Sequence, residues 1–321
     1  MEDSPARKRP LAVLLFSGGL DSILSAEVLA RAGVEVVLLR HESIFVPVRR
    51  GGYTPPCRMI TRDVSEGMVR LLGEPTYGLG RNANPCLDCK QMMYGLAWEE
   101  AQREGADFIA TGEVLGQRPM SQRRDAFRRM EKGAGVSGLV VRPLSARLLP
   151  PTVPEEKGLI DRQDMLDIHG RGRRRQMELA AGWGITDYPT PAGGCRLTDP
   201  NYAGRVFALA RMGRLDLADL RAARHGRLFE LGGGAFVLVG RSEEDNASLE
   251  RDAPPGALFL EMEDHPGPLA CLVGDPSPEA LDEARRLVIR YSRFKDLPPS
   301  AVRTWPVGER QREDEHTREP R

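Results

Sequence analysis

The chain has 321 residues and a formal net charge of zero, with 40% hydrophobic and 29% charged residues. This length exceeds the usual single domain, and the composition is typical of a globular protein. No apolar stretch approaches the ~20 residues that a membrane span requires, and the charged N-terminus lacks a signal-peptide pattern. We therefore expect a cytoplasmic protein with no membrane partner. Because net charge is zero, affinity for nucleic acid would have to come from local basic patches.

The start of the chain predicts a βαβ unit. Leu11 to Phe16 is an apolar run of six, which is the length of a buried strand, and a glycine loop follows it. A helical pattern over 22–31 ends before Gly33, and a second apolar run covers 34–39. Strand, loop, helix and strand in this order predict a parallel sheet, so we expect an α/β, Rossmann-like fold.

Further elements are expected in two groups. Helices are predicted over 61–72, 91–104, 160–168 and 173–183, and strands over 107–111 and 139–141. From about residue 229 the pattern changes to strands over 235–240, 257–262 and 269–273, with a helix over 278–291. We therefore expect a disordered N-terminus (1–10), an α/β domain with the cysteines and a basic helical extension (11–225), a smaller α+β domain (226–305) and a disordered charged tail (306–321).

The loop Ser17-Gly18-Gly19-Leu20-Asp21-Ser22 is a candidate phosphate site. A glycine loop between a strand and a helix directs backbone N–H groups at an anion, at the positive end of the helix dipole. The two serines can add hydroxyl donors, whereas Asp21 beside phosphates would hold Mg²⁺ or orient the loop. The loop is neither a Walker motif nor a dinucleotide fingerprint, and the structural alternative is a tight strand-to-helix turn.

These residues resemble the signature of the PP-loop (N-type) ATP pyrophosphatase superfamily. The resemblance implies that ATP, with Mg²⁺, is cleaved between its α- and β-phosphates and that AMP is transferred to a carbonyl oxygen, with Asp21 as a catalytic residue. A nucleophile carrying sulfur or nitrogen then displaces AMP. A second matching segment, Thr111-Gly112, is expected near the adenosine.

The five cysteines are odd in number and sparse, so reduced thiols are expected rather than a disulfide framework. Asn84-Pro85-Cys86-Leu87-Asp88-Cys89-Lys90, followed by Gly105 to Gly112, resembles the 2-thiouridine tRNA thiolases, a sulfur-inserting branch of the superfamily. The resemblance implies that Cys89 and Cys195 are the two cysteines of that family and catalytic, with Cys86 as an additional thiol.

Three chemistries remain open for these thiols. A C-x-x-C pair and a distant third cysteine suit a [4Fe–4S] cluster held by Cys86, Cys89 and Cys195, with one iron free for sulfide. A helix that starts at Cys86 and Cys89 would lower the pKa values of these two thiols. A zinc site would need His169 or Cys57 as a fourth ligand. A persulfide relay would need only Cys89 and Cys195. The sulfur donor is expected to be sulfide or a persulfide carrier; Cys271, in an apolar run, is expected in a core.

Two arginine clusters are candidate contacts for tRNA phosphates. We select Arg118 from the first, which continues through 123–129, and Arg171, Arg173, Arg174 and Arg175 from the second. A solvated helix face is the alternative for both.

The segment Val239-Gly240-Arg241, with Asn246, Leu249 and the later Pro266-Gly267-Pro268, resembles the NFACT RNA-binding domain. The resemblance implies a role in RNA binding, although the sequence shows no aromatic-rich basic face, and a folding or dimerisation module is the alternative. No THUMP-like segment precedes the loop, which argues against the 4-thiouridine enzymes that carry one.

Together these features predict an ATP-dependent tRNA sulfurtransferase that adenylates a uridine carbonyl and then inserts sulfur. The alternatives are a PP-loop amidotransferase or small-molecule thiolase, and a non-catalytic, nucleotide-regulated RNA-binding protein. The sequence leaves the oligomeric state unknown.

Overall fold

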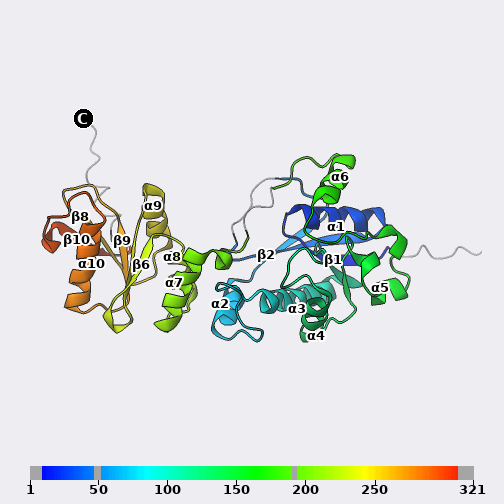
Figure 1. Cartoon of the computed structure of the whole chain (residues 1–321), viewed down its shortest axis with the longest axis horizontal. Coiled ribbons are helices and arrows are strands. Elements are labelled where there is room, and N and C mark those ends of the chain that lie inside the picture. Colours follow the sequence, from blue (N-terminus) through cyan, green and yellow to red (C-terminus); the bar gives the residue numbers. More distant parts are fainter. Residues whose placement is uncertain (1–8, 47–51, 190–193, 310–321) are drawn as a thin grey trace, which may run out of the picture. The chain divides into compact units, whose positions relative to one another are not determined.

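The computed structural model describes residues 9–46, 52–189 and 194–309. The chain separates into two compact units, of which one combines 1–80 with 84–195 and the other 81–83 with 196–321 (Figure 1). No helix among the described residues is long and apolar enough to cross a bilayer. The expected disordered ends, 1–10 and 306–321, lie largely outside the described residues.

The first unit is built on a parallel sheet. Its strands follow the order β3 (Met59–Asp63), β2 (Glu35–Glu42), β1 (Leu11–Leu15), β4 (Phe108–Thr111) and β5 (Val140–Val141). Its helices are α1 (Leu20–Arg31), α2 (Ser65–Gly73), α3 (Cys86–Glu104), α4 (Arg124–Gly133), α5 (Val153–Glu156) and α6 (Arg174–Gly182).

Both faces of this sheet are covered. Ala12 and Leu14 of β1 pack with α1 and α6, whereas Val13 between them packs with α3 and α4 on the opposite face. This alternation follows from the two-residue period of a strand. It explains why β1 is apolar throughout, and the predicted α/β fold is confirmed.

Two predicted helices of this unit need correction. The helix expected over 61–72 begins only at Ser65, because residues 59–63 form β3 and pair in parallel with β2. The helix expected over 160–168 is wrong. Leu166 donates its N–H to Pro143 and Ile168 donates to Leu144, so this segment bonds to another part of the chain, with a 3₁₀ turn only at Arg162–Asp164. Its apolar spacing reflects packing in the core rather than a helix.

The second unit is a smaller α+β body. Its antiparallel sheet follows the order β10 (Val302–Pro306), β8 (Leu258–Met262), β9 (Ala270–Val273), β7 (Phe236–Val239) and β6 (Arg227–Glu230). Its helices are α7 (Pro200–Arg211), α8 (Leu217–Ala222), α9 (Glu243–Asp252) and α10 (Pro278–Arg290), with α10 packed on one face of the sheet. Cys271 is buried in β9, as expected for a core cysteine.

The second unit begins earlier than the boundary expected at 225/226. Helix α7 belongs to it because the Tyr202 hydroxyl donates to the carbonyl of Leu220 and the Arg205 guanidinium donates to the carbonyls of Ala223 and Gly226. These bonds tie α7 and α8 to the start of β6, and the basic helical extension expected in the first domain therefore ends before α7.

The motif around Gly240 is structural. The Asn246 side-chain oxygen accepts the backbone N–H of Leu269, and a Cβ atom on Gly240 would lie 2.0 Å from that oxygen. Only glycine leaves room for this contact, which fixes the start of α9 to the segment before β9.

Candidate active site

The nucleotide-loop candidates lie where β1 passes into α1. Gly18 has a φ of 71°, and Gly19 is the residue that caps α1, so Leu20, Asp21 and Ser22 form the first helical turn. The Ser22 hydroxyl donates to the carbonyl of Gly19 at 2.8 Å and lies 3.3 Å from the Ser17 hydroxyl. The two hydroxyls thus shape the loop, at the helix end where an anion is favoured.

The segment after β4 lies against this loop. A Cβ atom on Gly112 would lie 2.7 Å from the backbone nitrogen of Ser22, so only glycine permits the approach. Thr111 is buried beside it. The sequence prediction that Thr111 and Gly112 belong to the same site as the loop is consistent with this geometry.

Asp21 has partners that the sequence could not indicate. Its Oδ2 accepts from Gln117 Nε2 at 3.1 Å and from Arg173 Nη2 at 3.4 Å. Its Oδ1 is buried without a hydrogen-bond partner. A buried, unpartnered carboxylate oxygen is costly, and it suits an additional cationic ligand such as Mg²⁺.

A second cation beside the loop was missed. Arg40, at the end of β2, reaches the loop, because a Cβ atom on Gly18 would lie 3.7 Å from Arg40 Nη2. Its guanidinium also lies 5.6 Å from the ring centroid of Phe16. The only sequence signal available was its position at the carboxyl end of a strand adjacent to β1, where ligands of open α/β sheets bind.

Two of the candidate cysteines lie in the first turn of α3, which begins at Cys86. Asn84 Nδ2 lies 3.1 Å from Cys86 Sγ and can donate to it. Burial raises the pKa of the Cys89 thiol to about 12, with Lys90 opposing and Cys195 and Cys86 adding to the rise. The expected lowering of the Cys89 pKa by the helix start is therefore wrong, because burial is the larger effect.

The three candidate thiols belong to one neighbourhood, since Cys86 and Cys195 both act electrostatically on Cys89. Within the described ranges, however, no three His, Cys, Asp or Glu side chains are close enough to hold a metal ion. Residues 190–193, which precede Cys195, lie outside the description. Cys57 instead lies near Glu27 and Tyr53, so nothing supports it as a fourth ligand.

A buried charged network joins the cysteine turn to the nucleotide loop. Lys90 Nζ lies 3.6 Å from Glu113 Oε1, and Thr111 Oγ1 donates to Glu113 Oε2 at 3.1 Å. Burial alone would raise the pKa of Glu113, but Lys90 and Arg142, with hydrogen bonds from Tyr94 and Thr111, bring that pKa below its ordinary value. Glu113 is thus an anion beside Gly112 that holds Lys90 next to Cys89.

The candidate RNA-binding arginines fall into different settings. Arg118 and Arg171 are exposed, and their segments are joined because Gly170 donates its N–H to the carbonyl of Leu115 at 2.7 Å. Arg174 pairs with Glu178 and Arg175 pairs with Asp167, both at the protein surface. Arg173 instead pairs with Asp21. The arginines at 128 and 129 lie on the exposed face of α4, as the alternative interpretation predicts.

Comparisons with known proteins agree with both resemblances. Residues 226–317 match the family described as NFACT protein RNA binding domain. The tRNA-specific 2-thiouridylase MnmA of Desulfosudis oleivorans is 30% identical over 113 residues, which are 32% of this chain and 32% of the relative. A probable tRNA sulfurtransferase of Methanosarcina acetivorans is 31% identical over 118 residues, 33% of this chain and 28% of the relative.

The chain thus spans about a third of the length of these curated relatives. Among solved structures, a 4-thiouridine synthetase–RNA complex with bound ATP aligns with 67% of this chain and 52% of its own at 17% identity and a TM-score of 0.35. That value is too low to bear on the function of this chain.

Proposed function

We propose that this chain is an ATP-dependent tRNA thiolase, which adenylates a uridine carbonyl and then replaces its oxygen by sulfur. The observation that carries the proposal is the short path from Cys89 through Lys90 and Glu113 to Gly112, which touches the first turn of α1. This path supports the proposal because it connects the candidate sulfur residues to the candidate phosphate loop. The partial similarity to tRNA thiolases supports the same function.

The residues around the loop have distinct tasks in this proposal. The N–H groups at the start of α1 and the Arg40 guanidinium hold the triphosphate. Asp21, through its unpartnered oxygen, holds the Mg²⁺ that accompanies ATP. The uridine oxygen attacks the α-phosphorus, the bond from that phosphorus to pyrophosphate breaks, and the resulting AMP ester is a good leaving group on the base.

The sulfur site has two versions. Thiolates of Cys86, Cys89 and Cys195 suit a [4Fe–4S] cluster, whose one iron without a protein ligand would supply sulfide as the nucleophile. The donor types fit this group, and binding it would require Cys89, which burial keeps protonated at neutral pH, to lose its proton. In the second version Cys89 and Cys195 handle a persulfide, and Cys86 is dispensable.

The nucleotide step is tested with the full chain, ATP and bulk tRNA by following AMP and pyrophosphate. Asp21→Ala should abolish both products, because Mg²⁺ and the triphosphate lose their anchor. Asp125→Ala is the matched control, an aspartate in the first turn of α4. Normal AMP formation by Asp21→Ala would show that the assigned role of Asp21 is wrong.

The sulfur step is tested on anaerobically purified protein by its absorption spectrum, by iron and sulfide content, and by thionucleoside formation. Serine at Cys86, Cys89 or Cys195 should remove all three signals, whereas Cys271→Ser should change none. Full thiolation by Cys86→Ser, with Cys89 and Cys195 essential, would establish the two-cysteine persulfide version instead.

The substrate class is tested by the salt dependence of tRNA binding. Replacing Arg171, Arg174 and Arg175 by alanine should make the dependence on salt shallower, because each phosphate contact releases counterions. Arg173 is left in place because it contacts Asp21. A chain that forms AMP but binds no RNA would favour the small-molecule thiolase or amidotransferase.

A further inference from the structure

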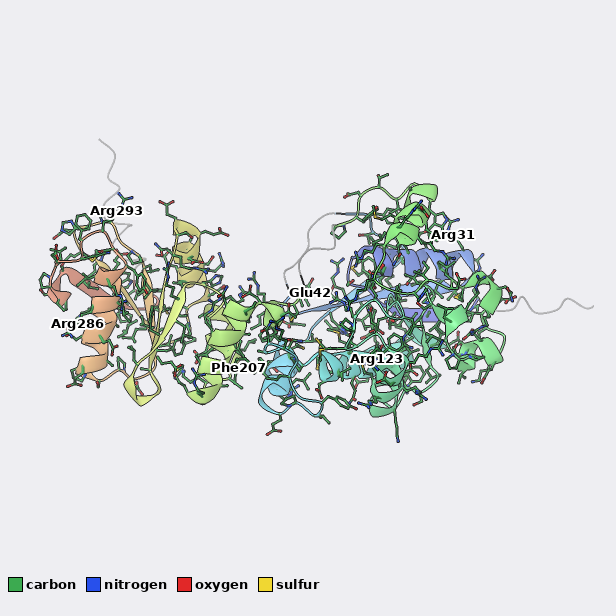
Figure 2. All side chains as sticks on the ribbon, viewed as in Figure 1. Arg31, Glu42, Arg123, Phe207, Arg286 and Arg293 are labelled. Atoms are coloured by element: carbon green, nitrogen blue, oxygen red, sulfur yellow. The ribbon has the colours of Figure 1, made fainter. Side chains whose placement is uncertain are left out.

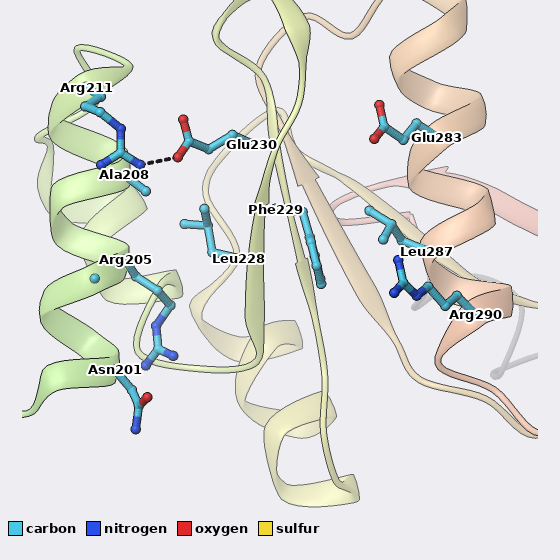
Figure 3. A pocket seen from close by; sticks show the side chains of 11 residues that line it. Asn201, Arg205, Ala208, Arg211, Leu228, Phe229, Glu230, Glu283, Leu287 and Arg290 are labelled. Atoms are coloured by element: carbon cyan, nitrogen blue, oxygen red, sulfur yellow. Dashed lines mark hydrogen bonds and ion pairs between the residues drawn. The ribbon is translucent and has the colours of Figure 1, made fainter.

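A cavity of about 510 Å³ opens in the second unit between α7, β6 and α10 (Figure 3). Pockets of several hundred Å³ are of the size that holds a small organic group such as a nucleotide. The motif residues around Gly240 do not line it. The family match covers β6 and α10 but not α7, and its description names RNA binding without naming a site.

Strand β6 crosses the middle of the cavity and lies at one end of the sheet order. Leu228 points from it toward α7, and Phe229 points toward α10 (Figure 3). Because successive residues of a strand face opposite sides, this edge strand presents an apolar side chain to each half of the cavity. An aromatic ring is therefore part of the lining, at a place where solvent has access.

A second ring adjoins Phe229. The centroids of Phe229 and Tyr291 are 5.7 Å apart, and Tyr291 is 37% exposed. The Arg227 guanidinium lies 4.7 Å from the Tyr291 centroid and that of Arg290 lies 6.0 Å from it. Although Arg227 lies over its ring, Tyr291 stays partly exposed, so an accessible aromatic side chain has cations beside it, the combination used for unpaired bases. Residues 227, 229, 290 and 291 thus form the aromatic basic surface that the sequence did not reveal.

The lining carries one net positive charge. Arg205, Arg211 and Arg290 face the cavity together with Glu230 and Glu283, and Arg211 is paired with Glu230. Arg205 is held in place by its bonds to the carbonyls at 223 and 226, so it is an ordered cation. Outside the Arg211–Glu230 pair the lining has Arg205 and Arg290, one from each flanking helix, as the cations that can meet phosphate, and Glu283 as the anion.

We propose that this cavity binds an unpaired nucleotide of an RNA strand. The base stacks on Phe229 in the lining and on the ring of Tyr291, which adjoins the cavity beside Phe229, and the neighbouring phosphates contact Arg290 and Arg205. The inference rests on the proposed function in one respect, that the partner is RNA, and it specifies where a single-stranded segment is held. Recognition through ring faces is tolerant of base identity, so the site contributes affinity rather than sequence specificity.

The test uses the full chain and fluorescein-labelled oligouridylate, with fluorescence anisotropy at several salt concentrations. Tyr291→Ser should weaken binding about tenfold, and Tyr291→Trp should restore it, because one stacked base contributes that order of affinity. Arg290→Ala should reduce the slope of log K against log salt by about one.

The matched control is Arg303→Ala. Arg303 lies on β10, at the opposite end of the sheet order, and its guanidinium is 5.0 Å from the ring centroid of Trp305. This variant should bind oligouridylate like the wild type. Equal losses of oligouridylate affinity in Arg303→Ala and Arg290→Ala would overturn the proposed site. Wild-type affinity in both Tyr291→Ser and Arg290→Ala would overturn it as well.

The outcomes separate this inference from the proposed function. If Tyr291→Ser and Arg290→Ala bind and thiolate tRNA normally, the cavity is not an RNA site and the proposed function stands. If the two substitutions weaken oligouridylate binding as predicted but the wild type forms no AMP, the proposed thiolase function is wrong and the cavity remains an RNA site. If the wild type binds no RNA at all, both are wrong.

Discussion

His41 should make the stability of the first unit depend on pH. It lies near the end of β2, and both of its ring nitrogens are buried without a hydrogen-bond partner. Burial, with a contribution from Lys90, lowers its pKa from the ordinary 6.5 to about 4. Its strand neighbour Glu42 is labelled in Figure 2. Protonation would place a charge in an environment that offers it neither water nor a partner.

The sign of the effect follows from this lowered pKa. Above pH 6.5 the ring is neutral in both the folded and the unfolded chain, so His41 costs nothing. As the pH falls from 6.5 toward 4, the unfolded chain takes up the proton and the folded chain does not, and stability is lost. The difference between a pKa of 6.5 in the unfolded chain and about 4 in the folded chain corresponds to a loss of about 3 kcal/mol in the free energy of unfolding once the pH is below both values.

The measurement compares the wild type with His41→Gln at pH 7 and pH 4.5. Because the chain has two units, hydrogen exchange of β2 amides is preferable to a global melt. The wild type should lose about 2 kcal/mol more than the variant on acidification. Other groups, such as His225 in the second unit, are present in both proteins and cancel. Equal losses in the two proteins would refute the assignment of a depressed pKa to His41.

Two further substitutions test the supports of the site. Gly112→Ala should displace the first turn of α1 and abolish ATP binding in equilibrium dialysis. It should also lower the free energy of unfolding of the first unit by about 1–3 kcal/mol. The control is Gly95→Ala in α3, which has open space around it and should be neutral or stabilising. Arg142→Met should cost about 3 kcal/mol in denaturant unfolding of the first unit, because Glu113 then keeps only Lys90 as a cationic partner and Glu131 loses its ion pair. Adding Glu113→Gln should recover part of that loss, and a fully additive double variant would contradict the proposed pairing.

The parts that the sequence predicted correctly depend on local patterns. The run before Ser17, the glycine loop and the helix after it are encoded within some twenty consecutive residues, and the order of such units dictates a parallel sheet. Strands β3, β6 and β10 were missed because edge strands bury little and their polar residues, such as Arg227 and Arg303, give no alternating signal. Pairing with a neighbour, rather than composition, makes them strands.

The candidate site shows the same division. The loop and the first turn of α3 were found because their residues are contiguous. Arg40, His41 and the link from Lys90 to Glu113 were not found, because each depends on which strand ends lie beside β1. The aromatic basic surface of the second unit was missed for the same reason, since Phe229 and Tyr291 are far apart in the sequence.

Arg173 connects the second arginine cluster to the nucleotide loop. Its place in the cluster predicts an RNA contact, yet its guanidinium pairs with Asp21, the residue proposed to hold Mg²⁺. Under the proposed function, Mg²⁺ on Asp21 would weaken the attraction between this carboxylate and the Arg173 guanidinium. A triphosphate at the loop would present oxygens to which Arg173 can transfer. Arg173 therefore belongs to the nucleotide loop in this structure, which is why the salt-dependence test replaces only Arg171, Arg174 and Arg175.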